Sequence, residues 1–250
     1  MAHNYDLIRL AQKLASDGPH RIEPTHRRVR ALFQGKCVID TLQAYHVWEH
    51  PNFPQFYVPK AAFKDVNLTV KDLVEGTNDA VHFVQLDNGR VATNRLLLFD
   101  IDTLKGLYKV DFHSMDQWFE EDVPVYGHPK DPYKRIDILH STRNVKVAVD
   151  GVTLADSSSP LFLLETTLRT RHYLPPTSVN WEYLRKSDTE TLCPYKGRAN
   201  YYDVIVNGKQ YRDLVWYYRY PTSESAPIAG YMCFYNEKVD LWVDGEKEQR

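Results

Sequence analysis

The chain has 250 residues, of which 43% are hydrophobic, 13% aromatic and 26% charged, and its formal net charge is −2. This profile is typical of a globular protein with one large or two small domains, and it excludes disordered, collagen-like and coiled-coil classes. The slightly acidic balance disfavours a role built on bulk attraction to nucleic acid or to an anionic membrane.

The first predicted element is an amphipathic helix over residues 5–15, within a lead-in segment of residues 1–26. The apolar residues recur at helical spacing, and Asp17-Gly18-Pro19 ends the pattern. Two further short helices are expected near residues 68–74 and 114–120. The apolar stripe of the first helix consists of Leu7, Leu10, Ala11 and Leu14.

An internal repeat follows, with an offset of 116 residues. Eight identities fall within 44 ungapped positions, where chance gives about two or three. The repeat predicts two homologous modules, residues 27–139 and 140–250. We interpret the first as a degenerate copy with an insertion between Gly89 and Trp118.

Each module opens with a predicted β-hairpin. The turns are Gln34-Gly35 and Asp150-Gly151, and Asn207-Gly208 joins a later pair of strands. Such dipeptides between alternating apolar runs are strong hairpin signals. The last strands are predicted over residues 231–235 and 239–243. The fold class is therefore mainly β: two tandem homologous modules of short antiparallel strands, plus an N-terminal helix.

Two blocks occur only in the second copy: CPYKG at residues 193–197 and APIAG at residues 226–230. With these blocks the chain resembles the domain-of-unknown-function family 427, and residues 118–139 resemble the joint of its two-copy members. The resemblance covers nearly the whole chain from about Arg27. It implies the fold class and a site present once, because the first copy lacks both blocks. The family is catalogued as nucleotidyltransferase-like, a label without an established general activity.

The nucleotidyltransferase alternative requires carboxylates that hold divalent metals. Asp100 and Asp102 follow an apolar run and would share one face of a strand. No Gly-Ser loop precedes them and no third carboxylate is evident. The interpretation without a functional role is a strand end with exposed carboxylates.

Residues 46–50 (HVWEH) match the inverted zinc-protease pattern His-x-x-Glu-His. That pattern needs a helix, whereas the repeat partner, residues 162–166, is predicted to be a strand. In a strand, His46 and His50 would lie about 13 Å apart. We therefore expect two partly exposed histidines flanking an inward-facing or cleft-facing Glu49.

Glu49 and Glu165 are equivalent in the two copies, and each is followed eight residues later by a tyrosine, Tyr57 or Tyr173. A buried, unpaired carboxylate has a raised pKa, which suits a general acid or base. The alternative without a catalytic role is a structural ion pair with an arginine such as Arg169 or Arg171.

The CPYKG block is the leading candidate site. Pro194 and Gly197 predict a tight loop that presents Tyr195, Lys196 and Arg198. A lysine beside aromatic rings can bind an anion, act as a base or form a Schiff base. Cys193 would be a nucleophile only beside a histidine. The bland interpretations are an exposed or salt-bridged Lys196 and a buried, inert Cys193.

Aromatic residues are concentrated in the second copy. One set is expected in the core and the other along a pocket for a planar or cyclic ligand. Stacking of nucleic-acid bases is disfavoured, because no basic run is longer than Arg27-Arg28. The aromatic set is Tyr201, Tyr202, Trp216, Tyr217, Tyr218, Tyr220, Tyr231 and Tyr235.

These observations favour a metal-independent enzyme that acts by acid/base chemistry on a small metabolite in a pocket of the second module, as an isomerase, lyase or hydrolase. The alternatives are a non-catalytic small-molecule-binding or protein-interaction module and a metal-dependent nucleotidyltransferase. We expect no cofactor and no nucleic-acid or membrane partner. The three scattered cysteines and the lack of a long apolar run predict a cytoplasmic protein. The expected catalytic residues are Lys196, Tyr195, Glu165 and Tyr218, and the expected substrate-binding residues are Trp216, Arg198, Tyr173, Tyr201 and Cys193.

Overall fold

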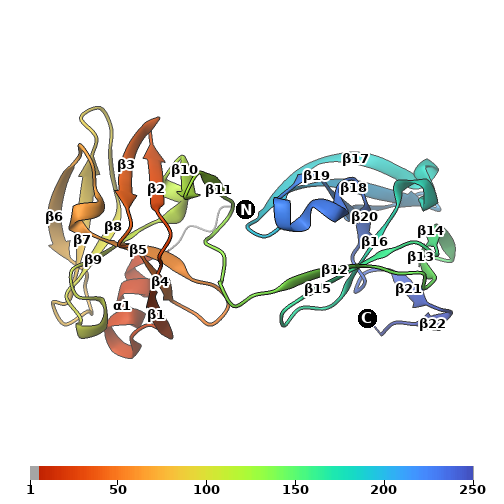
Figure 1. The fold of residues 1–250 in the computed structure, drawn as a ribbon, viewed down its shortest axis with the longest axis horizontal. Helices are drawn as coiled ribbons and strands as arrows, with labels where there is room; N and C mark the ends of the chain where they lie inside the picture. The colour runs from red at the N-terminus through yellow and green to blue at the C-terminus, as the bar shows by residue number, and fades with distance from the viewer. Residues whose placement is uncertain (1–5, 250) are drawn as a thin grey trace. The chain divides into compact units, whose positions relative to one another are not determined.

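The computed structural model describes residues 6–249. The chain divides into two units, Met1–Asp131 and Pro132–Arg250 (Figure 1). The repeat predicts this boundary after Leu139. The division comes earlier because strand β12 (Ile136–His140) pairs with β15 (Leu161–Glu165) of the second unit.

The predicted hairpins are present in both units. Gln34-Gly35, Asp150-Gly151 and Asn207-Gly208 all have positive φ at both residues, between 48° and 80°. This backbone matches the twist of the flanking strands, which is why such turns connect them. The two predicted C-terminal strands are also confirmed.

The first unit contains two antiparallel sheets whose facing sides share one apolar core. The seven-stranded sheet runs in the order β1 (Arg21–Pro24), β4 (Tyr45–Trp48), β5 (Gln55–Pro59), β9 (Leu107–Val110), β8 (Ala92–Phe99), β7 (Val81–Asp87), β6 (Asn67–Leu73). The four-stranded sheet runs in the order β11 (Val123–Val125), β10 (Gln117–Glu120), β2 (Val29–Phe33), β3 (Lys36–Thr41).

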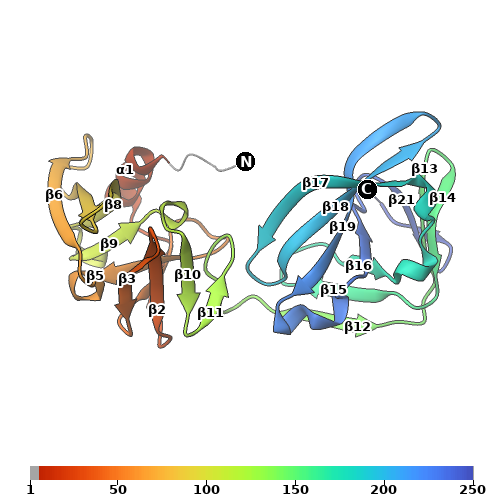
Figure 2. The ribbon, with the colours of Figure 1, turned by 90° about the horizontal axis from the view of Figure 1, so that it is seen from above.

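The second unit repeats this architecture, with β17, β18 and β19 side by side as a long meander (Figure 2). Its seven-stranded sheet runs in the order β12, β15, β16 (Arg171–Leu174), β20 (Met232–Phe234), β19 (Lys209–Pro221), β18 (Gly197–Val206), β17 (Leu184–Cys193). Its four-stranded sheet runs in the order β14 (Val152–Ser157), β13 (Val145–Val149), β21 (Asp240–Val243), β22 (Glu246–Lys247).

Strand order and register confirm the duplication. The two seven-stranded sheets have the same strand order as written above. The four-stranded sheets also match when the first is read from its other edge, as β3, β2, β10, β11 against β14, β13, β21, β22. Trp118 pairs with Ala31 in the first unit, as Leu241 pairs with Val147 in the second. Trp118 is therefore the counterpart of Leu241, and the insertion inferred before Trp118 was wrong.

Two predicted short helices were also wrong. Residues 67–73 form edge strand β6, and residues 117–120 form β10 after a single 3-10 turn, η3 (Phe112–Ser114). Pairing with β7 and with β2 decides both segments, so tertiary contacts override local spacing.

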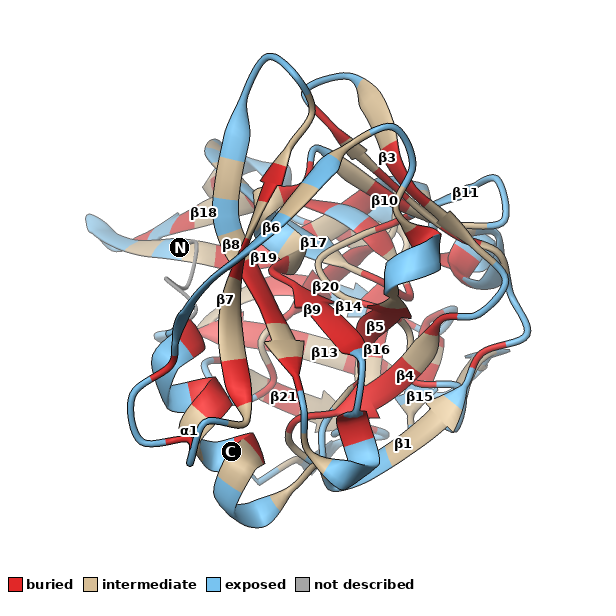
Figure 3. Ribbon diagram, turned by 90° about the vertical axis from the view of Figure 1, so that its left-hand side faces the viewer, coloured by how far each residue is buried: buried red, intermediate tan, exposed pale blue. Residues whose placement is uncertain are grey.

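Helix α1 (Leu7–Asp17) confirms the predicted amphipathic helix, although Tyr5 lies outside the described residues. Asp6 caps its N-terminus by accepting the backbone N–H groups of Ile8 and Arg9. Its apolar stripe is buried and its opposite side is exposed (Figure 3). The stripe packs on the outer face of the seven-stranded sheet, away from the four-stranded sheet, against Tyr57, Leu97 and Phe99. Among residues 6–249, no helix is long and apolar enough to cross a membrane.

Candidate active site in the second unit

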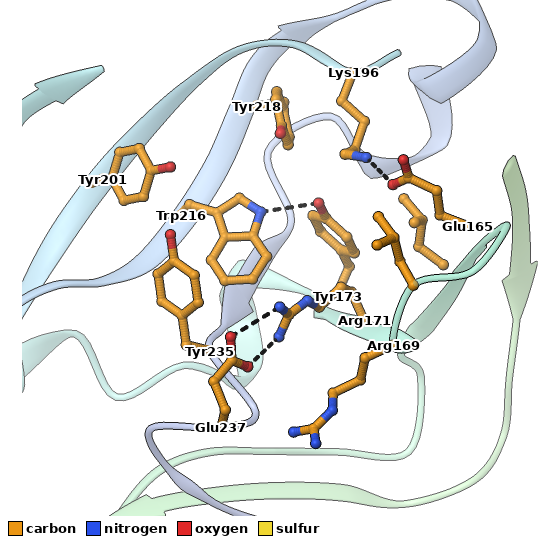
Figure 4. A pocket seen from close by; sticks show the side chains of 12 residues that line it. Glu165, Arg169, Arg171, Tyr173, Lys196, Tyr201, Trp216, Tyr218, Tyr235 and Glu237 are labelled. Carbon is orange, nitrogen blue, oxygen red and sulfur yellow. Dashed lines mark hydrogen bonds and ion pairs between the residues drawn. The ribbon is translucent and has the colours of Figure 1, made fainter. Parts of the chain in front are cut away.

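A cavity of about 550 Å³ lies on the outer face of the second unit's seven-stranded sheet. It is the face that corresponds to the α1-covered face of the first unit, and residues 132–249 contain no α-helix to cover it. Its size is within the range of small-molecule sites. It is lined by Leu163, Glu165, Leu168, Arg169, Arg171, Tyr173, Lys196, Tyr201, Trp216, Tyr218, Tyr235 and Glu237 (Figure 4).

An ion pair between Lys196 and Glu165 lies on one side of the cavity. Lys196 Nζ is 2.6 Å from Glu165 Oε2, and the two side chains are 12% and 8% exposed. Lys196 comes from the turn between β17 and β18, and Glu165 ends β15. The partner of Glu165 is thus Lys196, not an arginine of residues 169–171. Two residues that were predicted separately as site residues form one ion pair.

The loop that carries Lys196 is held by the short 3-10 helix η6 (Ser223–Ile228). The carbonyl of Tyr195 accepts the hydroxyls of Thr222 and Ser225, and the Thr222 N–H donates to the Lys196 carbonyl at 3.2 Å. Gly197 has φ +97°, and a Cβ there would lie 3.3 Å from the Tyr220 carbonyl. Glycine is therefore required for the chain to pass this point.

The APIAG block packs behind Tyr218. The Gly230 N–H donates to the Tyr218 carbonyl at 2.9 Å, and Ile228 is fully buried. Burial raises the pKa of Tyr218, so its phenol stays protonated at neutral pH. Among the described residues, its hydroxyl has no hydrogen-bond partner. Both family-like blocks thus support the cavity, and only CPYKG contributes a lining side chain, Lys196.

Trp216 forms the apolar wall. Its Nε1–H donates to the Tyr173 hydroxyl at 3.1 Å, with the rings edge to face. Burial raises the pKa of Tyr173 well above its ordinary value. The Tyr201 hydroxyl bonds to that of Thr191 at 2.8 Å. Since the Trp216 Nε1–H is already bonded to Tyr173, Trp216 offers a ligand mainly its ring surface.

A second ion pair, absent from the sequence analysis, closes the other side of the cavity. Arg171 donates to both carboxylate oxygens of Glu237, at 2.6 and 3.1 Å. These hydrogen bonds lower the pKa of Glu237 to about 2. The Arg171 guanidinium also lies over Trp216 and Tyr235, 5.4 and 5.8 Å from the ring centroids. Strand alternation could have indicated Arg171, because it is two residues before Tyr173 and shares its face.

Three of the expected site residues do not line the cavity. Tyr195 is buried, and its backbone carbonyl is bonded to Ser225 of η6. Arg198 is exposed and pairs with Glu190 at 2.5 Å. Cys193 is a half-buried free thiol. None of these three side chains is therefore assigned a role in the cavity.

His46 lies in strand β4, which ends at Trp48, as expected from the repeat partner, whereas Glu49 and His50 lie in the bend that follows. His46 is buried, stacks on Phe56 and has its Nε2 3.5 Å from Glu120 Oε1. The expectation that His46 is partly exposed was therefore wrong. His50 is half-buried and Glu49 points inward. Within residues 6–249, no three His, Cys, Asp or Glu side chains are grouped so as to hold a metal ion.

Asp100 and Asp102 lie beyond the end of β8 at Phe99 and do not share a strand face. Both are exposed, Asp100 is 3.3 Å from Lys105, and Asp102 begins the 3-10 turn η2 (Asp102–Leu104). The interpretation as a strand end with exposed carboxylates is confirmed.

Comparison with known proteins supports the sequence resemblance. The profile of a domain of unknown function, DUF427, matches residues 21–78 and 137–245, which together exceed half the chain. The two segments fall in the two units and include the residues that build the cavity. No curated protein matches the chain.

Proposed function

The chain belongs to the DUF427 family, and for this member we propose that the second unit is an enzyme that transforms a small molecule by proton transfer in the cavity around Lys196 and Glu165. The observation that carries the proposal is their 2.6 Å ion pair, largely removed from solvent yet on the cavity lining. A titratable group that is largely desolvated beside a charge partner in a cleft is a candidate for a catalytic role.

The pair supplies complementary roles. Lys196 holds Oε2 of Glu165, and Oε1 has no hydrogen-bond partner among the described residues. That oxygen is the proposed general base, which takes a proton from the substrate. The Lys196 ammonium would stabilise the negative charge that then develops on the substrate.

Tyr218 is the proposed hydrogen-bond donor that orients the substrate. Its raised pKa keeps the phenol neutral, and its hydroxyl is uncommitted among the described residues. A proton removed by Glu165 and returned at another atom gives an isomerisation, and loss of a leaving group gives an elimination. We therefore favour an isomerase or lyase over a hydrolase.

A non-catalytic binding protein is the second candidate. It is favoured by the fact that both cavity carboxylates, Glu165 and Glu237, are already paired with cations. For either role we propose a cytoplasmic setting, because Cys37, Cys193 and Cys233 are all free thiols.

A deuterium-exchange assay tests the proposed base on many candidate substrates at once. The protein is incubated in D₂O with a pool of small metabolites, and mass spectrometry follows new products and deuterium gained at carbon. We expect at least one compound to exchange or convert. The Glu165→Gln variant should lower that rate about 100-fold or more, as loss of a general base does.

Glu246→Gln is the matched control, because Glu246 is exposed on β22 and outside the cavity. It should keep the wild-type rate. An exchange rate unaffected by Glu165→Gln would refute the proposed base. Binding of a pool compound without exchange or conversion would favour the binding protein.

A further inference from the structure

We propose that the ligand of this cavity is a planar-ring acid, whose carboxylate or phosphate is bound by Arg169 and whose ring lies against Trp216 and Tyr235. The inference rests on the proposed function for the existence of a ligand, and adds its chemical class.

The cavity lining contains three cationic side chains and two carboxylates, so one cation is not balanced. Lys196 is paired with Glu165, and Arg171 with Glu237. The remaining charged lining residue is Arg169, which makes no ion pair or hydrogen bond with any other described residue. An anion is the partner that balances this cavity.

The nearest carboxylate is not free to neutralise Arg169. Arg169 is close enough to Glu237 to help lower its pKa, although the hydrogen bonds from Arg171 are the larger cause. Both oxygens of Glu237 are nevertheless taken by Arg171. Arg169 extends from the connection between β15 and β16, on the side of the cavity that holds the Arg171–Glu237 pair (Figure 4). Its planar guanidinium can therefore grip an incoming carboxylate or phosphate in bidentate fashion.

The body of the cavity favours a flat, apolar group. Trp216 and Tyr235 have ring centroids 4.6 Å apart at an angle of 50°. Tyr173, Tyr201 and Tyr218 complete the aromatic lining. Offset and edge contacts between rings add to the area that they bury. The Lys196–Glu165 pair and the Arg171–Glu237 pair lie apart along the cavity, the first towards the upper right and the second towards the bottom of the view (Figure 4). A ring held between them would present one end to Arg169 and the other to the proposed base.

Three probes of one size separate the contributions of charge and ring: benzoate, phenyl phosphate and neutral benzamide. Titrations at low ionic strength, followed by ligand-observed NMR, measure each Kd. We expect at least one anion to bind about tenfold more tightly than benzamide, which corresponds to about 1.4 kcal/mol. The tighter of the two anions identifies the acid group.

Two variants and one control assign the contacts. Arg169→Gln should bring the anion to within about threefold of benzamide. Trp216→Leu should weaken binding of all three probes about tenfold, because it removes the ring against which they lie. Leucine is chosen because Leu97 stands at the equivalent position of the first unit. Arg212→Gln removes an exposed arginine of β19 outside the cavity and should change nothing.

Benzamide binding as tightly as both anions, anion preference that survives Arg169→Gln, or no binding by any probe would overturn this ligand class. The D₂O assay separates that failure from failure of the proposed function. Exchange that depends on Glu165 alongside equal benzamide binding would retain the enzyme and discard the acid. Anion selectivity without exchange would retain the acid and discard the enzyme.

Discussion

The two units share one strand order but use the same sheet face in opposite ways. In the first unit, helix α1 covers the outer face, and Glu49 is buried there with Lys109 at 2.9 Å and the Tyr57 hydroxyl at 2.9 Å. In the second unit, no α-helix covers the described face, and the equivalent Glu165 lines a cavity with Lys196.

Register shows how few changes separate the two faces. Leu97 pairs with Lys109 as Trp216 pairs with Cys233, so an aliphatic side chain stands where the second unit has its aromatic wall. Lys109 takes the position of the buried Cys233. The duplicated fold thus has this sheet face closed by α1 in one copy and hollowed into a cavity in the other.

The largest expected effect is on the buried pair. Lys109→Ala should lower the free energy of unfolding of the first unit by about 3–5 kcal/mol, because Glu49 loses its cation in the interior. Lys109 and Glu49 are each only 1% exposed. Native-state hydrogen exchange, read by mass spectrometry, reports the two units separately.

Lys196→Ala is the counterpart in the second unit. Because its partner faces a cavity that water can enter, the loss there should be no more than about half as large. Equal losses in both units would contradict the distinction between a closed and an open copy.

Removing core volume under α1 should have the next largest effect. Leu14 is fully buried, and Leu14→Ala should destabilise the first unit by about 3 kcal/mol through the cavity it leaves. Ile8→Ala, on the exposed side of the same helix, should change stability by less than about 0.5 kcal/mol. Urea unfolding measures both, and similar effects would argue against α1 as a packed cover.

The smallest effect is the pH dependence that Glu237 gives to the stability of the second unit. The hydrogen bonds from Arg171 lower the pKa of Glu237 from 4.5 to about 2, so the folded state binds fewer protons there than the unfolded state. This contribution is complete above about pH 4.5 and is lost as the pH falls towards 2. Calorimetry should show a melting temperature that falls over this range, and a weaker fall in Glu237→Gln. Identical pH profiles would exclude the pair as its source.

Local patterns predicted the hairpins, the duplication and helix α1, because turn dipeptides and apolar spacing act over a few residues. They failed at residues 67–73 and 117–120, where pairing with distant strands decides the conformation. The repeat alignment had the same weakness: without strand register it placed before Trp118 an insertion that the first unit does not have.

The candidate site also has features that the sequence predicts and features that only the tertiary structure shows. The sequence by itself determined the fold class, the family, the equivalence of Glu49 and Glu165, and the placing of Lys196 and Trp216 at a pocket of the second unit. Only the tertiary structure paired Glu165 with Lys196, added Arg171 and Glu237, and left Tyr195 out of the cavity lining. The physical reason is that ion pairs join side chains from separate strands, and sheet register, which no local pattern encodes, decides which of them meet.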